Sequence, residues 1–257
     1  MALVNESLVL GITSVAMVLS CLVFGLICIA RGIRNREKLL NAAGLNIIIT
    51  GSYMLGTAVE FFAVIIFEVH LSPPELYILL SYTQIPFGVM FMGILAGELI
   101  MPNYKDAVLG ALTALGFVFM GFILSFLYIV MTELPYIFPT FGIIVPPNLD
   151  YLMMDTLHPG LVNGFTPYSE ALYLLFFFDF AVFFLLVIGS LVKAYQSSGL
   201  LRRKFIYLAI GFGVFVFGSL SDKFIDIYAE DWGMYWIAIS RILMCTYGIW
   251  LYLGLKT

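Results

Sequence analysis

The most constraining feature of this chain is how its basic residues alternate with long apolar runs. Ten of the twelve Lys and Arg residues lie in alternate gaps between seven such runs, or at the end of the last one. A helix needs ~20 apolar residues to cross the ~30 Å hydrocarbon core of a bilayer, and each run is long enough. The runs are 7–30, 39–68, 75–100, 107–131, 170–193, 205–228 and 235–255. They predict an all-α integral membrane protein, built as a single seven-transmembrane-helix bundle over residues 1–257.

The basic gaps also predict the orientation of this bundle. They are residues 31–38, the segment after the third run that contains Lys105, and residues 193–204; Lys256 follows the last run. The remaining gaps and the N-terminus contain no Lys or Arg. Because basic gaps are retained in the cytoplasm, we expect the N-terminus outside, the C-terminus in the cytoplasm, and a multi-pass protein of the cell membrane.

Composition excludes several other classes of protein. The chain is 62% hydrophobic and 11% charged, whereas a soluble domain is about 25% charged. No basic face exists outside the short loops, so we expect no nucleic-acid partner. The three cysteines all lie inside apolar runs and are read as packing residues, with no disulfide.

One connection is much longer than the others. Residues 132–169, between the fourth and fifth predicted helices, contain six of the ten prolines and many aromatic residues. Connections of this length are usually functional or disordered, and the aromatic content argues against disorder. We expect a packed cap over the outer mouth of the bundle, with a short strand at residues 143–145.

Polar and ionisable side chains inside the spans are concentrated near the predicted outer surface, at a depth of ~7–14 Å by helical rise. Such groups are costly in a bilayer unless they face protein, a partner or water. Because five helices contribute, we expect a ligand- or ion-binding layer formed by Glu60, Gln84, Asp179, Asp222, Lys223, Asp226 and Arg241. The alternative is structural, since Arg241 paired with Asp179 or Asp222 could simply hold helices together.

Two further patterns concern single helix faces. Asn46, Thr50, Tyr53 and Thr57 form a polar stripe that leads to Glu60; stripes of this kind are more often hydrogen-bonded helix interfaces than conduits. Small residues at helical spacing on the fourth run (Gly110, Ala114) and on the sixth (Gly211, Gly218) predict close helix packing. Pro86 predicts a kink in the third helix.

The sequence gives little support for three known classes of membrane protein: retinal proteins, intramembrane aspartyl proteases and zinc hydrolases. Microbial rhodopsins share the predicted topology but attach retinal to a lysine of the last span, where this chain has Arg241. Asp179 and Asp222 resemble the paired aspartates of intramembrane aspartyl proteases, but that family's third, proline-containing motif is missing. Both histidines lie outside the spans, so a catalytic zinc site is not expected. We therefore expect no cofactor and no bound metal, and a protein that is not an enzyme.

Two functional classes remain. In span count and orientation the chain resembles the seven-helix input modules of prokaryotic signalling proteins and the large eukaryotic receptor class. That resemblance implies a sensor or receptor with a small ligand or ion in the outer polar layer, signalling to a cytoplasmic partner on the basic loops 31–38 and 193–204. The alternative is a proton- or cation-conducting transporter that uses Glu60 and the polar stripe.

Overall fold

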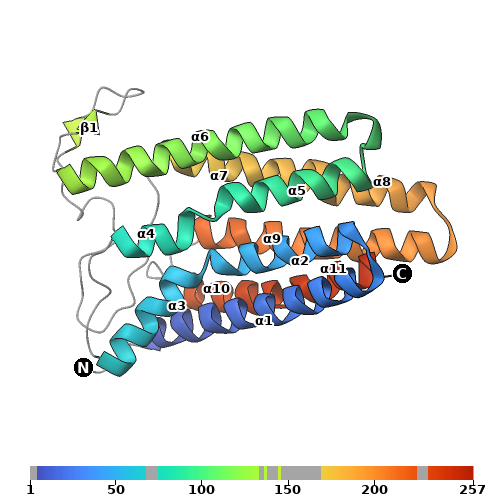
Figure 1. The fold of residues 1–257 in the computed structure, drawn as a ribbon. Helices are drawn as coiled ribbons and strands as arrows, with labels where there is room; N and C mark the ends of the chain where they lie inside the picture. The colour runs from blue at the N-terminus through green and yellow to red at the C-terminus, as the bar shows by residue number, and fades with distance from the viewer. Residues whose placement is uncertain are drawn as a thin grey trace.

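The computed structural model describes residues 5–67, 75–132, 136–137, 144–145, 169–224 and 231–256. These residues form a bundle of long helices that run side by side (Figure 1). At one end lie the connections around residues 35–38, 100–105 and 196–199 together with residue 256, and this end is called the basic end below. The opposite end carries the start of α1 (Asn5–Asn35).

The helices follow the apolar runs closely. After α1 come α2 (Lys38–Ser52), α3 (Leu55–Phe62), the π-helical η1 (Ala63–Phe67), α4 (Glu75–Tyr82), α5 (Ile85–Leu99), the short η2 (Pro102–Tyr104) and α6 (Lys105–Thr132). The second half contains α7 (Ser169–Val182), the π-helical η4 (Phe183–Ile188), α8 (Gly189–Gln196), α9 (Gly199–Phe224), α10 (Asp231–Met244) and α11 (Tyr247–Leu255). Gly199 begins α9 with φ +59°, a backbone conformation that glycine adopts without strain.

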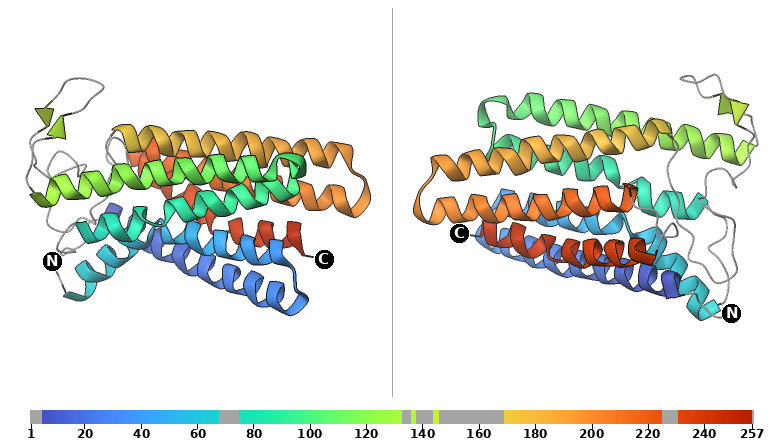
Figure 2. Two further views of the ribbon diagram at one scale, coloured as in Figure 1. Left: turned by 45° about the horizontal axis from the view of Figure 1, so that its top comes forward. Right: turned by 180° about the vertical axis from the view of Figure 1, so that it is seen from behind.

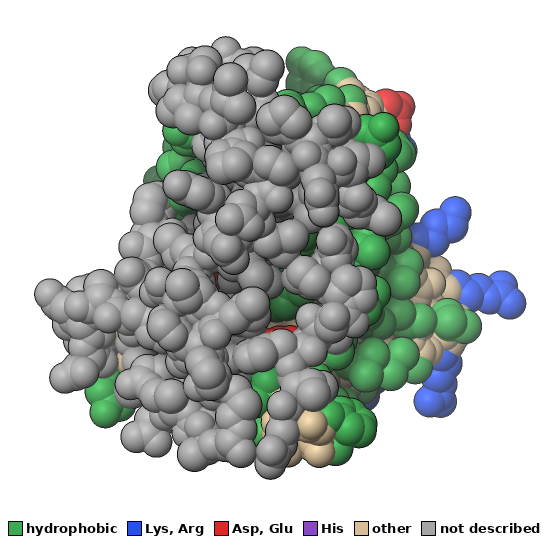
Figure 3. All heavy atoms as spheres, turned by 90° about the vertical axis from the view of Figure 1, so that its left-hand side faces the viewer, with side chains coloured by type: hydrophobic (Ala, Val, Ile, Leu, Met, Phe, Trp, Pro, Cys, Tyr) green, Lys and Arg blue, Asp and Glu red, His purple; other side chains and the backbone are tan. Residues whose placement is uncertain are grey.

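The predicted helical architecture is confirmed. Among the described residues, six helices are long and apolar enough to cross a membrane, and the pair α2 and α3–η1, bent by 48°, makes a seventh if it is one span. Many large hydrophobic side chains point outward, for example Phe117, Phe184 and Ile239, and hydrophobic atoms cover much of the visible flank (Figure 3). An apolar exterior of this kind suits a lipid environment.

Three of the helical stretches are interrupted. The second bends by 48° between Ser52 and Leu55, and the third has a break between Tyr82 and Ile85. The latter break agrees with the kink predicted from Pro86, which occupies the first turn of α5, where its missing N–H is not needed. The seventh stretch is interrupted between Met244 and Tyr247.

The helices form two flanks around a central pair. In both views α2 and α9 lie between α5, α6 and α7 on one side and α1, α10 and α11 on the other (Figures 1 and 2). The main hydrophobic core joins these elements through fully buried side chains that include Met17, Ile47, Leu186, Phe212 and Leu251. A second cluster, around Phe119 and Phe178, joins α4, α5, α6 and α7.

Glycines permit close approach at some crossings but not at all the predicted ones. A Cβ on Gly211 would meet Leu251 at 2.6 Å and one on Gly218 would meet Met244, which confirms the packing prediction for the sixth run. For the fourth run the prediction is wrong. A Cβ on Gly110 would meet nothing within 4 Å, and Ala114 is likewise exposed. Both lie on the exposed face of α6, because the face that packs against α5 is the one carrying Gly116, next to Pro86.

The long connection is described at two short segments only. Tyr136–Ile137 (β1) pairs antiparallel with Ile144–Val145 (β2). The remainder of residues 132–169 beyond α6, including the expected cap, lies outside the described residues. The three cysteines are free thiols.

Candidate functional site

The described members of the predicted polar layer divide into two groups. One is an ion pair between Arg241 of α10 and Asp222 of α9. The other is Asp179 of α7 with Ser219 of α9, at the wall of a partly open cavity between the helices. Asp226 and the side chain of Lys223 lie outside the described residues.

The Arg241 group connects three helices. Its Nε donates to both carboxylate oxygens of Asp222, at 3.1 and 3.3 Å. Its Nη1 donates to the Ser14 hydroxyl at 2.8 Å and to the Leu10 carbonyl at 3.2 Å. The Ser14 hydroxyl in turn donates to the Leu10 carbonyl at 2.8 Å. We call these four residues the Arg241 clamp.

The clamp is buried. The Arg241 and Asp222 side chains are exposed by only 8% and 7%. A buried ion pair is tolerated best when further hydrogen bonds satisfy the charged groups, and α1 accepts two such bonds from Arg241 Nη1. The arrangement therefore matches the structural alternative, with Arg241 joining α1, α9 and α10.

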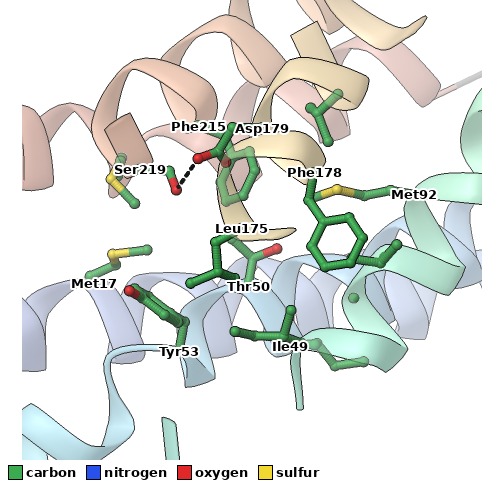
Figure 4. Close-up of a pocket in the computed structure, with 15 residues that line it drawn as sticks. Met17, Ile49, Thr50, Tyr53, Met92, Leu175, Phe178, Asp179, Phe215 and Ser219 are labelled. Atoms are coloured by element: carbon green, nitrogen blue, oxygen red, sulfur yellow. Dashed lines mark hydrogen bonds between the residues drawn. The ribbon is translucent and has the colours of Figure 1, made fainter. Parts of the chain in front are cut away.

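The cavity lies inside the bundle, about one helical turn away along α9. It has a volume of about 70 Å³ and is bordered by α1, α2, α5, α7, α9 and α10. Its wall is mostly apolar and includes Met17, Met92, Leu175, Phe178 and Phe215 (Figure 4). We call it the Asp179 cavity. In the view onto the end opposite the basic end, hydrophobic and acidic atoms are visible near the centre (Figure 3).

Polar groups enter the Asp179 cavity from opposite walls. On one wall the Ser219 hydroxyl donates to Asp179 Oδ2 at 3.1 Å, and Asp179 is only 4% exposed. On the facing wall lie Thr50 of α2 and Tyr53, the residue that follows this helix (Figure 4). The result is an apolar space with a carboxylate and three hydroxyl groups at its margin, which can bind a mainly apolar molecule carrying a small polar group.

A smaller cavity of about 10 Å³ adjoins the first. The two share four lining residues, Val89, Met92, Phe178 and Val182. The smaller one is lined only by apolar residues and reaches Ala96 and Leu186. The apolar space thus extends along α5 and α7.

The predicted polar stripe is engaged in contacts between helices. Asn46 Nδ2 donates to the Tyr247 hydroxyl of α11 at 2.8 Å. The hydroxyls of Thr57 and Tyr77 of α4 share a hydrogen bond of 2.8 Å. Tyr53 places its ring against that of Tyr82, with centroids 5.6 Å apart. These contacts fit the hydrogen-bonded helix interface that the sequence favours for such a stripe.

The last two members of the predicted layer lie in other surroundings. Glu60 is buried within α3, at 2% exposure. The Gln84 amide donates to the Leu80 carbonyl of its own helical stretch at 2.5 Å. Neither residue borders the Asp179 cavity.

Most of the cavity wall could not be identified from the sequence. Met17, Phe178 and Phe215 are apolar residues in apolar runs, and such residues carry no signal that separates a cavity wall from a filled core. Ser219 was recognisable only as a polar neighbour of Asp222 on the same face of the sixth run. Among the described residues, no cluster of three or more His, Cys, Asp or Glu side chains could hold a metal ion.

The chain matches no family model, and neither a curated protein nor a solved structure shows significant similarity to it.

Proposed function

We propose that this chain is a multi-pass protein of the cell membrane that binds a small ligand inside its helix bundle and acts as a sensor or receptor. The observation that carries the proposal is the Asp179 cavity, a partly open space of about 70 Å³ with a carboxylate–hydroxyl pair in its wall. A fully packed core has few voids larger than a water molecule, so a cavity of this size in the bundle is a binding site to be tested.

The surroundings of the cavity support a sensing role. The breaks in the second and third helical stretches lie beside it, with Tyr53 and Tyr82 in contact across them. Segments joined at such breaks can change their relative angle when a ligand fills the space between them. Under the orientation predicted by the basic loops, the N-terminus is outside and the change reaches a cytoplasmic partner.

The basic end supplies a surface for that partner. Arg34, Arg36, Arg202 and Arg203 are all exposed there. By contrast, Arg31 is occupied by the Tyr252 hydroxyl and ring. The loops 31–38 and 193–204 are therefore the proposed contact for an acidic cytoplasmic effector.

A transporter that conducts protons or cations through Glu60 and the polar stripe is the alternative. The hydrogen bonds of Asn46 with Tyr247 and of Thr57 with Tyr77 favour a helix interface over a path. An intramembrane hydrolase based on Asp179 and Asp222 is disfavoured, because Asp222 is ion-paired with Arg241 and a neighbouring cation opposes the shared proton such a dyad needs. These contacts support ligand binding over both alternatives.

Xenon provides a direct test of the cavity. Engineered apolar cavities of about 150 Å³ bind benzene or xenon, so a smaller space suits a single xenon atom. We expect xenon-129 NMR of the protein in nanodiscs to report a saturable site that empty nanodiscs lack. Val182→Phe, in the cavity wall, should abolish it. Val192→Phe, at an exposed position of α8, should leave it intact.

Two results would contradict the proposal. If xenon finds no saturable site in the native protein, the cavity does not bind ligands. If proteoliposomes show proton or cation flux that Glu60→Gln abolishes, the transporter replaces the receptor.

A further inference from the structure

At the basic end, two cations approach a single tyrosine ring. Arg31 of α1 donates through Nη1 to the Tyr252 hydroxyl of α11, and its Cζ lies 5.1 Å from the centre of the Tyr252 ring. Lys256, which follows α11, places its Nζ 5.8 Å from the same centre. These distances limit the separation of the two charges to about 11 Å. We call Arg31, Tyr252 and Lys256 the Tyr252 site.

Neither cation of the Tyr252 site has an acidic partner among the described residues. The ion pair of Lys105 with Glu98 at the same end joins α5 to α6, on the other flank of the bundle. Arg31 and Lys256 are both exposed, and like charges this close are only partly screened by salt. They therefore repel each other, and an anion placed between them would be attracted to both.

The Tyr252 site can donate several hydrogen bonds to such an anion. A guanidinium has five N–H donors and an ammonium has three. Within the described residues the Tyr252 hydroxyl is the only acceptor for Arg31, and that hydroxyl still has its own O–H to donate. Phosphate oxygens accept charge-assisted bonds from arginine and lysine. The donor set therefore fits a phosphate group.

The Tyr252 site lies close to the ends of its helices. Arg31 is four residues before the end of α1, and Tyr252 is three before the end of α11. At 1.5 Å per residue, both are about 5–6 Å from the helix ends. The two helices end near each other (Figures 1 and 2), and further in they pack tightly, since a Cβ on Gly248 would meet Phe24 at 2.6 Å. This is the depth at which lipid head groups meet a transmembrane helix.

An exposed apolar track leads from the Tyr252 site toward the middle of α1. Ile27 and Val23 precede Arg31 by four and eight residues and are 39% and 52% exposed. Residues four apart lie above one another on a helix, so these side chains continue the face that carries Arg31. A hydrocarbon chain can lie along them within the bilayer, where no closed cavity limits its length.

We propose that the Tyr252 site binds the head group of an anionic glycerophospholipid. Its phosphate oxygens accept hydrogen bonds from Arg31, Lys256 and the Tyr252 hydroxyl, and one acyl chain lies along Ile27 and Val23. A zwitterionic lipid also has a phosphate, but the cation attached to it is repelled by the two basic side chains. The inference does not depend on the Asp179 cavity or on the proposed effector.

Native mass spectrometry of the protein released from nanodiscs tests this proposal. The nanodiscs contain equal amounts of phosphatidylglycerol and phosphatidylcholine with matched acyl chains. A basic residue near an anionic membrane surface contributes about 1 kcal/mol, or about fivefold in affinity, so two cations should favour bound phosphatidylglycerol by about 25-fold. Arg31→Gln and Lys256→Gln should each lower this preference by about fivefold. Arg34→Gln, at an exposed position of the same helix end, is the matched control and should lower it by less than about twofold.

Tyr252→Leu separates a formed site from general attraction to a basic surface. The variant keeps every charge but removes the ring and hydroxyl that hold Arg31, so the preference should fall by about threefold or more. Thermal unfolding in phosphatidylcholine nanodiscs checks that the variant is folded. Tyr252→Phe, which keeps the ring, provides a second test and should lower the preference by about twofold.

Three results would overturn the proposal. The first is an equal loss of preference in Arg34→Gln and Arg31→Gln, and the second is an unchanged preference in both Tyr252 variants; either would mean that charge alone attracts the lipid. The third is displacement of phosphatidylglycerol by millimolar inorganic phosphate but not by chloride of equal ionic strength, which would make a soluble phosphate the occupant. None of these results bears on the xenon site, so the proposed function is tested separately.

Discussion

The Arg241 clamp and the Asp179 cavity each contain a buried carboxylate on α9 or next to it. The groups that surround the two carboxylates are different. At the clamp, the Arg241 Nε donates to Asp222, and its Nη1 donates to the Ser14 hydroxyl and the Leu10 carbonyl. At the cavity, Asp179 accepts from Ser219 and borders an apolar space of about 70 Å³. The first site is formed by contacts between protein groups of three helices, whereas the second borders a cavity.

The difference shows how structural and functional charges in a membrane bundle can be separated. Burying a charge is costly unless partners satisfy it, so an ion pair that is also hydrogen-bonded to a third helix fits a structural role. Ser219 and Asp222 lie three residues apart on α9 and therefore on one face. One turn of α9 thus connects the cavity to α7 and the clamp to α1 and α10, and a ligand that moves α9 would act on both.

The largest predicted effect comes from breaking the clamp. Arg241→Ala leaves Asp222 buried without its cation, and we expect the free energy of unfolding to fall by about 3–5 kcal/mol. Unfolding in detergent micelles titrated with a denaturing detergent measures this loss. Arg202→Ala, an exposed position at the basic end, is the matched control and should change little.

The double variant Arg241→Met with Asp222→Leu sharpens this prediction. Removing both charges leaves no orphan carboxylate, so most of the stability should return. The contrary result is a single variant as unstable as expected and a double variant that fails to recover stability. In that case the hydrogen bonds from Arg241 to α1 contribute more to the free energy of unfolding than the ion pair does.

A smaller effect on stability is expected from adding a methyl group at a tightly packed glycine than from breaking the clamp, and it can be compared with the same change at an exposed glycine. Gly44 of α2 lies against α1, where an added Cβ would meet the Gly25 carbonyl oxygen at 2.7 Å. Backbone cannot move aside as a side chain can, so Gly44→Ala should cost about 1–3 kcal/mol of unfolding free energy. Gly110→Ala on the open face of α6 should not destabilise the protein and should stabilise it by up to about 1 kcal/mol, because alanine favours a helix more than glycine does. Equal effects at both positions would contradict the assignment of the α6 face as open.

The same contrast explains what the sequence could and could not predict. Apolar runs and basic gaps determined the helices, because a bilayer imposes length and composition on anything that crosses it. Arg241 with Asp222 was among the pairings expected, since an arginine in an apolar run must find an acid. The cavity was not predictable, because apolar residues such as Met17 and Phe178 give the same sequence pattern whether they line a filled core or a void. The prediction that Gly110 packs against another helix was wrong for a related reason. Small residues permit close contact between helices, but they do not determine which face of a helix makes that contact.

An intermediate effect tests the polar stripe as an interface. Thr57→Val removes the hydrogen bond to Tyr77 that joins α3 to α4, and we expect a loss of about 1 kcal/mol in unfolding free energy. Tyr77→Phe should cost a similar amount, and the double variant should cost little more than either. Additive losses in this double-mutant cycle would show that the two hydroxyls do not depend on each other.

The smallest effect on stability is expected at Asp179, in the wall of the cavity. Asp179→Asn keeps an oxygen that accepts from Ser219 and removes a buried charge. The weaker hydrogen bond and the relief of desolvation oppose each other, so the free energy of unfolding should change by less than about 1 kcal/mol in either direction. Thermal unfolding in nanodiscs without ligand measures this change.

A loss comparable to that of Arg241→Ala would erase the distinction between the two sites, because Asp179 would then be part of a second clamp. A small change in stability would instead show that Asp179 is not needed to hold the helices together. The chain would then use Asp222 to join its helices, while Asp179 of α7, bonded to Ser219 one turn away along α9, borders the cavity.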